Sequence, residues 1–159
     1  MRLELVKISF DLDDTLIPSD RANFPTMKRN LLQLLLMVEP IRAGSVQLIN
    51  NLKSDGHVVG IYTTSFRSSF RIWLQFLMYG LSMSFIINEY LNRKSLDDLH
   101  ITASKYLPAF EIDLHADDSP GVDIEGERFC FNTVIVEQQN LNWVSSVLSH
   151  ISSFQLSSK

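Results

Sequence analysis

Short apolar runs alternate with amphipathic stretches along most of this chain. Runs typical of buried strands lie at residues 3–10, 57–62, 84–87, 112–116 and 133–136. Apolar residues at helical spacing predict helices at residues 26–38, 44–55, 69–79 and 141–151, with a weaker signal at 91–99. Strands that are apolar on both faces and alternate with helices are typical of a parallel sheet covered on both sides. The pattern therefore predicts an α/β fold, a three-layer α/β/α Rossmann-like domain with a central parallel sheet of about five strands.

The pattern contains no repeat and no clear linker, so residues 1–159 are predicted to form a single domain with its own core. Only a loop and one helix fit between the first strand and the next regular helix, which predicts a small lid or minimal cap at residues 18–40. The apolar stripe at residues 31–38 is predicted to pack in the core, and contact with a second copy in a homo-oligomer is the alternative. Residues 152–159 are predicted to fray.

Composition and charge indicate which binding partners and which cellular compartment to expect. The net charge is −4 and no basic tract occurs, which argues against general binding to nucleic acid. The longest apolar stretch, residues 31–38, is interrupted by Gln33 and is too short to cross a bilayer, and the first residues lack the apolar segment of a signal peptide. Cys130 is the only cysteine, so no internal disulfide can form, which fits a reducing compartment. We expect a cytoplasmic protein that binds neither membranes nor nucleic acid.

Three carboxylates within four residues end the first apolar run. They are Asp11, Asp13 and Asp14, and Thr15 follows them. Like charges held this close repel one another, and a hard divalent cation with oxygen ligands would offset that repulsion. A solvated turn with a helix cap is the alternative interpretation. The acidic cluster favours a metal site and phosphate chemistry.

Two further predicted strands end in polar groups suited to the same site. Thr63 and Thr64 follow the second strand, and Asp117 and Asp118 follow the fourth. Either pair alone is also typical of a strand-end turn. In an open parallel sheet, however, ligands bind at the carboxyl ends of the strands, near a switch in strand order. If these strands are neighbours, the polar groups converge with the acids that follow the first strand.

These motifs resemble those of the haloacid-dehalogenase (HAD) superfamily of phosphohydrolases. Asp11-Leu12-Asp13-Asp14-Thr15 matches that family's Asp-x-Asp-x-Thr motif, Thr63 matches its strand-end threonine, and Asp117-Asp118 matches its acidic pair. The order and rough spacing of the motifs fit across essentially the whole chain. The resemblance implies a HAD-like fold and a phosphatase, a hydrolase of phosphoric monoesters that uses Mg²⁺ and an aspartyl-phosphate intermediate.

The resemblance also implies a role for each matched residue. Asp11 would be the nucleophile, and Asp13 would protonate the leaving alcohol and then deprotonate water. Thr63 would hydrogen-bond the transferring phosphoryl group, and Thr64 would add its backbone N–H to substrate binding. Mg²⁺ would be held by a set of acidic residues, namely Asp11, Asp13 through its backbone carbonyl, Asp118 and, in support, Asp117.

The phosphate-binding lysine of that family has two candidates in this chain. Lys94 lies at a spacing usual when a full helix separates the lysine from the acidic pair. Lys105 lies close before the fourth predicted strand, and the interval after it contains Pro108 and leaves no room for a helix. We favour Lys105 as the catalytic lysine and keep Lys94 as the alternative for substrate binding. If neither reaches Asp11, the alternative function is a catalytically weak HAD-like binding or regulatory module.

The sequence also gives expectations for the openness of the site and for the roles of His115 and Arg67. A small lid predicts an open site, which suits a phosphorylated substrate that is either a small molecule or a macromolecule. His115, inside the fourth predicted strand, is expected to be a core histidine with its hydrogen bonds satisfied. Arg67 is expected to be a solvated residue at a helix start, and binding of a second anionic group of the substrate is its alternative role.

Overall fold

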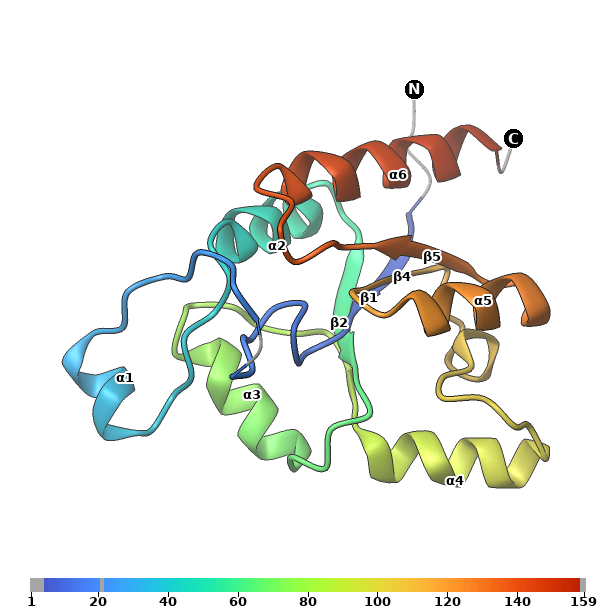
Figure 1. The fold of residues 1–159 in the computed structure, drawn as a ribbon, viewed down its shortest axis with the longest axis horizontal. Helices are drawn as coiled ribbons and strands as arrows, with labels where there is room; N and C mark the ends of the chain where they lie inside the picture. The colour runs from blue at the N-terminus through green and yellow to red at the C-terminus, as the bar shows by residue number, and fades with distance from the viewer. Residues whose placement is uncertain (1–4, 21, 158–159) are drawn as a thin grey trace.

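Five parallel strands form one central sheet in this computed structural model, which describes residues 5–20 and 22–157 (Figure 1). The strands are β1 (Lys7–Phe10), β2 (Val58–Tyr62), β3 (Ile86–Ile87), β4 (Leu114–Asp117) and β5 (Asn132–Ile135). Their order is β3-β2-β1-β4-β5, and every neighbouring pair runs parallel. The predicted α/β fold with a parallel sheet of about five strands is confirmed. Residues 3–4 of the first predicted strand lie outside the described residues.

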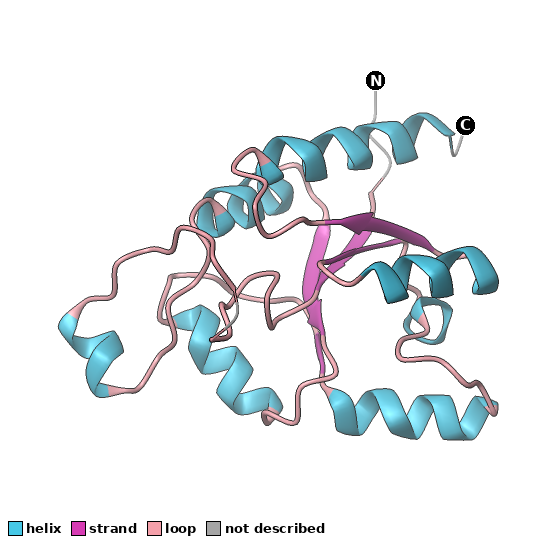
Figure 2. Cartoon of the chain, in the orientation of Figure 1, coloured by secondary structure: helices cyan, strands magenta, loops and turns pink. Residues whose placement is uncertain are grey.

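Helices cover both faces of the sheet and give the three predicted layers (Figure 2). One face carries α2 (Ser45–Ser54), α3 (Ser69–Leu77) and α6 (Trp143–Ser157). Leu48, Phe76 and Val147 of these helices belong to one apolar cluster with the strands. The other face carries α4 (Glu89–Leu99), the 3₁₀ helix η1 (Leu107–Phe110) and α5 (Pro120–Phe129). There Leu107 and Val122 belong to a second apolar cluster, so each face of the sheet has its own core.

The strand order reverses next to β1, at the centre of the sheet. The chain runs outward from β1 through β2 to the edge strand β3, and then crosses back to β4 on the other side of β1. Ligands of open parallel sheets bind in the crevice at such a reversal, outside the carboxyl ends of the strands. The candidate residues that follow β1, β2 and β4 therefore lie at the edge where a ligand site is expected.

Residues 22–43 form an arm that extends away from the sheet (Figure 1). An antiparallel bridge between Thr26 and Arg42 joins its two limbs, and α1 (Leu31–Leu35) forms its tip. The predicted helix at residues 26–38 is wrong except for this tip. The limb before the tip is extended, because it pairs with the returning limb instead of coiling on itself.

The apolar stripe of the arm faces solvent. Leu31 and Leu35 are 82% and 76% exposed, whereas Gln33 between them is buried. The Gln33 side chain caps the start of α1 and donates a hydrogen bond to the Met78 carbonyl at 2.8 Å. The prediction that residues 31–38 pack in the core is wrong for every apolar residue of the stripe except Val38, because α1 turns the polar Gln33 toward the body of the protein. Contact of the exposed leucines with a second copy stays a prediction.

Side chains of α3 hold the arm through its backbone. The Arg71 guanidinium donates to the carbonyl of Leu36 at 3.0 Å and to that of Met37. The Gln75 amide accepts from the Glu39 N–H at 2.9 Å and donates to the Glu39 carbonyl at 2.7 Å. The path of the arm is thus fixed at main-chain atoms next to α3.

Three helical segments differ from the prediction. The turn-like sequence after Asp117 starts α5, because the first helical turn accepts Pro120, whose missing N–H would have no partner there. The interval after Lys105 has room for the single turn of η1. The fraying predicted from residue 152 is wrong as far as Ser157, where α6 ends, and residues 158–159 lie outside the described part. No helix within the described residues is long and apolar enough to cross a membrane.

Replacing both Leu31 and Leu35 with Gln is expected to leave the free energy of unfolding unchanged within about 0.5 kcal/mol, because both side chains are already in water. Leu48→Ala, by contrast, empties a fully buried position and is expected to cost about 2–5 kcal/mol. Urea denaturation followed by circular dichroism measures both. A large loss of stability in the arm variant would show that its leucines pack against the body.

Candidate active site

A buried polar stripe crosses two adjacent strands at the reversal of strand order. Side chains two residues apart on a strand share one face, so Ser9 and Asp11 lie on the same side of the sheet as His115 and Asp117. The register supports this, because Ser9 of β1 pairs with His115 of β4. All four residues are buried. The stripe places two carboxylates next to each other in an apolar layer, where they need a positive partner.

Lys105 is that partner. Its Nζ lies 2.7 Å from Asp11 Oδ1, 2.5 Å from Asp117 Oδ2 and 3.0 Å from His115 Nε2. An ammonium group has three N–H donors, and the two carboxylates accept from two of them. His115 Nε2 lies 3.0 Å from both Lys105 Nζ and Asp117 Oδ2, and it accepts from the ammonium or donates to the carboxylate according to its tautomer. The other ring nitrogen, Nδ1, lies 2.7 Å from Ser9 Oγ. The cluster of two carboxylates and one ammonium carries one net negative charge.

Burial sets the protonation of this cluster. Burial raises the pKa of Asp11 to about 6, although Lys105 pulls it down. Burial also acts to raise the pKa of Asp117, but the contact with His115 and the charge of Lys105 outweigh it and hold that pKa well below its usual range. Burial and the Lys105 charge lower the pKa of His115 to about 4, so its imidazole is neutral at pH 7. Asp117 is thus the permanent counterion of Lys105, and Asp11 is the carboxylate with the weaker compensation.

The loop that carries Lys105 is held at three points. The Tyr62 hydroxyl accepts from the Tyr106 N–H at 2.8 Å, and the Asn92 amide donates to the Ser104 carbonyl at 2.7 Å. The Glu125 carboxylate of α5 accepts from the Ser104 N–H at 2.7 Å and from its hydroxyl at 2.6 Å. These bonds fix the backbone on both sides of Lys105 and so direct its buried side chain toward Asp11.

Of the two candidate lysines, the structure places Lys105 and not Lys94 beside Asp11. Lys94 is exposed on α4 and lines a separate hollow with Asp98 and Phe110.

Asp13 is bound to an arginine. Nη1 of Arg67 lies 2.7 Å and 2.9 Å from the two Asp13 oxygens, and its Nη2 lies 3.0 Å from Glu39 Oε1. Arg67 also donates to the Ser65 hydroxyl at 2.9 Å. The guanidinium thus joins the loop after β1 to Glu39 at the base of the arm, and both oxygens of the Asp13 carboxylate are bound to it.

Asp118 is tied to the loop after β1 through Thr15. The Asp118 N–H donates to Thr15 Oγ1 at 3.0 Å, and that hydroxyl donates to Asp118 Oδ1 at 3.2 Å. Burial and the neighbouring Asp117 raise the pKa of Asp118. Asp14 has a different role, because its carboxylate accepts from the Ser19 N–H at 2.8 Å and closes a local turn.

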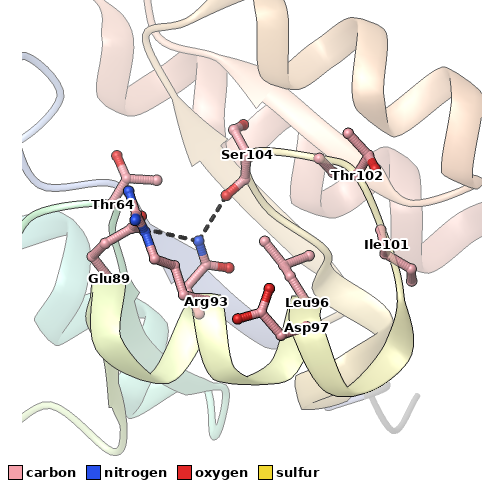
Figure 3. Close-up of a pocket in the computed structure, with 10 residues that line it drawn as sticks. Thr64, Glu89, Arg93, Leu96, Asp97, Ile101, Thr102 and Ser104 are labelled. Atoms are coloured by element: carbon pink, nitrogen blue, oxygen red, sulfur yellow. Dashed lines mark hydrogen bonds and ion pairs between the residues drawn. The ribbon is translucent and has the colours of Figure 1, made fainter.

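The two threonines after β2 are placed differently. Thr63 is buried, and its hydroxyl accepts from the Ser65 N–H at 3.1 Å. Thr64 is exposed and lines a hollow beside α4. Thr63 directly follows Tyr62, whose ring centroid lies 5.8 Å from Lys105 Nζ, whereas Thr64 lines the hollow beside α4 (Figure 3).

Among the described residues, one group of three side chains is close enough to hold a metal ion, and a cationic side chain already lies beside it. Ligand atoms of Asp11, His115 and Asp117 lie within 4.8 Å of one another. The Lys105 ammonium lies within hydrogen-bond distance of all three residues, so that position already holds a positive charge. Further oxygens, those of Asp118, the second Asp11 oxygen and the Asp13 carbonyl, are the hard ligands that Mg²⁺ prefers and could hold it.

The charges of the site leave an imbalance that a divalent cation would remove. Carboxylates outnumber cationic side chains in and around the site. The carboxylates are Asp11, Asp13, Asp117, Asp118 and Glu39, and the cations that act on them are Lys105, Arg67 and Arg42. Burial is the main cause of the raised pKa values of Asp11 and Asp118, and the neighbouring Asp117 carboxylate adds to both. The side chain of Asp13 is engaged by Arg67, which leaves its backbone carbonyl for a metal.

The chain matches no protein-family model and no curated protein sequence. Fold and site geometry are therefore what support a function. They also show contacts that the sequence did not predict. Arg67, expected to be solvated with binding of an anionic substrate group as its alternative, pairs with Asp13; His115 lies beside Lys105; and Glu125 holds the lysine loop. Only His115 carried a usable signal, because it lies two residues before Asp117 and therefore shares its face of the strand.

Proposed function

We propose that this protein is a Mg²⁺-dependent phosphohydrolase that acts on a phosphoester through an aspartyl-phosphate intermediate. The observation that carries the proposal is the salt bridge of 2.7 Å between the buried Lys105 ammonium and Asp11 at the carboxyl end of β1. A carboxylate nucleophile next to a fixed cation is suited to a phosphate dianion, because the cation offsets the repulsion between the two anions. The HAD-like motifs of the sequence support the same reaction class.

The chain's own residues can perform both halves of the reaction. An Asp11 oxygen attacks phosphorus, the bond from phosphorus to the ester oxygen breaks, and that oxygen takes a proton from Asp13. In the second half, Asp13 removes a proton from water, which attacks the phosphorus of the aspartyl phosphate and frees Asp11 and inorganic phosphate. Lys105 would balance charge throughout, and Thr63 would hydrogen-bond the phosphoryl oxygens.

Mg²⁺ would be held by Asp11, Asp118 and the backbone carbonyl of Asp13, with Asp117 in support. When bound, it would neutralise charge on the phosphoryl group and orient it toward Asp11.

A second candidate function follows from the contact between Arg67 and Asp13. Because Arg67 binds both Asp13 oxygens, the proton transfer requires Asp13 to exchange one of these hydrogen bonds for the substrate. A chain in which that exchange does not occur would bind a phosphoester with little turnover. This is the catalytically weak binding or regulatory module.

Hydrolysis of p-nitrophenyl phosphate by purified protein tests the proposal. Turnover is expected with Mg²⁺ and is expected to disappear with EDTA. Acid-quenched samples should carry one phosphoryl group on the peptide that contains Asp11, as read by mass spectrometry. Turnover that survives EDTA, or a phosphoryl group on another residue, would contradict the mechanism. A rise of the melting temperature with Mg²⁺, without turnover of any ester in a broad panel, would favour the binding module.

A further inference from the structure

The Arg67 guanidinium is fixed in place at the edge of the candidate active site. Its Nη1 lies 2.9 Å from Ser65 Oγ, and its Nη2 lies 3.0 Å from Glu39 Oε1 at the base of the arm. The Asn88 side-chain amide donates to the Arg67 carbonyl at 3.0 Å and holds the backbone of the same residue. Three contacts that do not involve Asp13 therefore set the position of this cation.

The Asp13 carboxylate meets this cation with both of its oxygens. Nη1 of Arg67 lies 2.7 Å from Oδ1 and 2.9 Å from Oδ2. Hydrogen bonds from a guanidinium are strongest when the acceptor is an ionised carboxylate, and they weaken when the carboxyl group takes up a proton and loses its charge. Arginine stays positively charged in proteins. The contact is therefore strongest when Asp13 carries no proton.

The two halves of the proposed reaction use Asp13 in opposite states. In the second half Asp13 accepts a proton from water, which an ionised carboxylate can do. In the first half it must already carry the proton that it gives to the leaving oxygen, and an apolar environment is what keeps such a carboxyl group protonated in known enzymes. The Asp13 side chain is 42% exposed and is bound to a cation instead. Asp13 is thus better placed as the base of the second half than as the acid of the first.

An ester can do without this acid if its leaving oxygen is weakly basic. When an Asp11 oxygen attacks phosphorus, the electron pair of the breaking bond goes to the leaving oxygen. A phenolate carries that charge easily, so it departs as the anion and takes its proton from water. An alkoxide is far more basic and needs the proton while it departs, and such help is typically worth about 10²–10⁴-fold in rate. The cost of freeing Asp13 from Arg67 therefore falls on alkyl esters.

We infer that Arg67, through its contact with Asp13, makes this protein select phosphoesters of phenols against phosphoesters of alcohols. Arg67 is then a positioning residue that determines specificity through Asp13. The inference rests on the proposed phosphohydrolase activity and adds a substrate class to it.

Three esters that each carry one benzene ring and one phosphate test the inference: p-nitrophenyl, phenyl and benzyl phosphate. Their leaving oxygens become more basic in this order. The ratio kcat/KM reports the first half of the reaction, which ends when the leaving group departs. With the unaltered protein and Mg²⁺, kcat/KM is expected to fall by about 10³-fold or more from the first ester to the last. Arg67→Gln should reduce this span about tenfold, because Asp13 is then free to carry a proton.

Glu39→Gln is the matched control. It removes the ion pair of the arm with the same guanidinium and leaves the contact between Arg67 and Asp13, so the span should stay that of the parent. Arg67→Lys keeps a cation beside Asp13 and should keep most of the span. Thermal unfolding of each variant shows whether it folds.

Asp13→Asn tests the inference without altering Arg67. Because a phenolate leaves without the Asp13 proton, this variant should release one p-nitrophenol per protein molecule in a burst, at a rate within about tenfold of the parent. Turnover should then stop, since the base of the second half is missing, and the phosphoryl group should stay on Asp11. A variant that shows no burst would overturn the inference.

The outcomes separate this inference from the function on which it rests. Similar kcat/KM for p-nitrophenyl and benzyl phosphate would overturn the inference and leave the proposed function standing. The same holds if Arg67→Gln lowers kcat/KM for all three esters by one factor, which is what a merely structural role predicts, or if Glu39→Gln narrows the span as much as Arg67→Gln. Absence of turnover with every ester would overturn both.

Discussion

Asp11→Asn is expected to abolish turnover of p-nitrophenyl phosphate and to leave a protein at least as stable as its parent. The amide cannot attack phosphorus as a carboxylate does, which removes the first step. Its oxygen can still accept the hydrogen bond from Lys105, whose charge stays paired with Asp117. Because burial makes the ionised form of Asp11 unfavourable, the variant is expected to gain up to about 3 kcal/mol at pH 7 without metal.

The stability difference between Asp11→Asn and its parent depends on pH, and its direction follows from the pKa of Asp11. The pKa of Asp11 is about 6 in the folded protein and 3.8 as its ordinary value, so the folded state binds the proton more tightly. The contribution of Asp11 to the stability of the parent therefore falls as the pH rises from about 4 to about 6. Urea denaturation in EDTA should show little difference between parent and variant below pH 4 and the full gain above pH 7. Turnover by the variant, or a clear loss of its stability at pH 7, would contradict the proposed nucleophile.

Lys105→Met is expected to lose both activity and stability. Its removal leaves Asp11 and Asp117 buried beside each other without their common cation, a change that typically costs about 3–5 kcal/mol. Loss of the fixed positive charge next to the nucleophile should lower kcat by roughly 10²–10³-fold. The stability deficit should shrink as the pH is lowered, because protonation of the two carboxylates relieves their repulsion. Thermal unfolding between pH 4 and pH 8 measures this trend.

Lys94→Met is the matched control for that variant. It removes the same charge from an exposed position on α4, so stability and kcat/KM are expected to stay close to those of the parent. If Lys94→Met lost activity and Lys105→Met kept it, the assignment of the catalytic lysine would be reversed. Asp11→Asn and Lys105→Met are both expected to be inactive. The first is expected to be more stable than the parent and the second less stable, so unfolding measurements distinguish them.

The positions of the site residues on β1, β2 and β4 follow from the sequence for a topological reason. Apolar runs reveal parallel strands, and the carboxyl ends of parallel strands meet at one edge, so Asp11, Thr63 and Asp117 could be placed together before any coordinates. Spacing alone did not decide between Lys94 and Lys105. That choice depends on hydrogen bonds that hold the lysine loop, and such long-range contacts leave no local pattern.

Long-range contacts also explain why the sequence did not predict the pairing of Arg67 with Asp13 or the exposure of the arm. The pairing of Arg67 with Asp13 joins residues 54 positions apart through two side chains whose directions depend on their loops. In the arm, leucines at helical spacing favoured a buried helix, and the structure shows them exposed. What decided the matter is the buried contact of Gln33 with Met78, which turns the apolar side outward.

The backbone attachment of the arm has a consequence for how this protein can change over evolutionary time. Because Arg71 and Gln75 hydrogen-bond to main-chain atoms at residues 36–39, these bonds do not depend on the exposed leucine side chains of the tip. Natural substitutions of the exposed leucines Leu31 and Leu35 are therefore not constrained by core packing, whereas Gln33 is constrained by its bond to Met78. The outer surface of the arm is free to diverge and to acquire new contacts, while Glu39 at its base keeps the connection to Arg67.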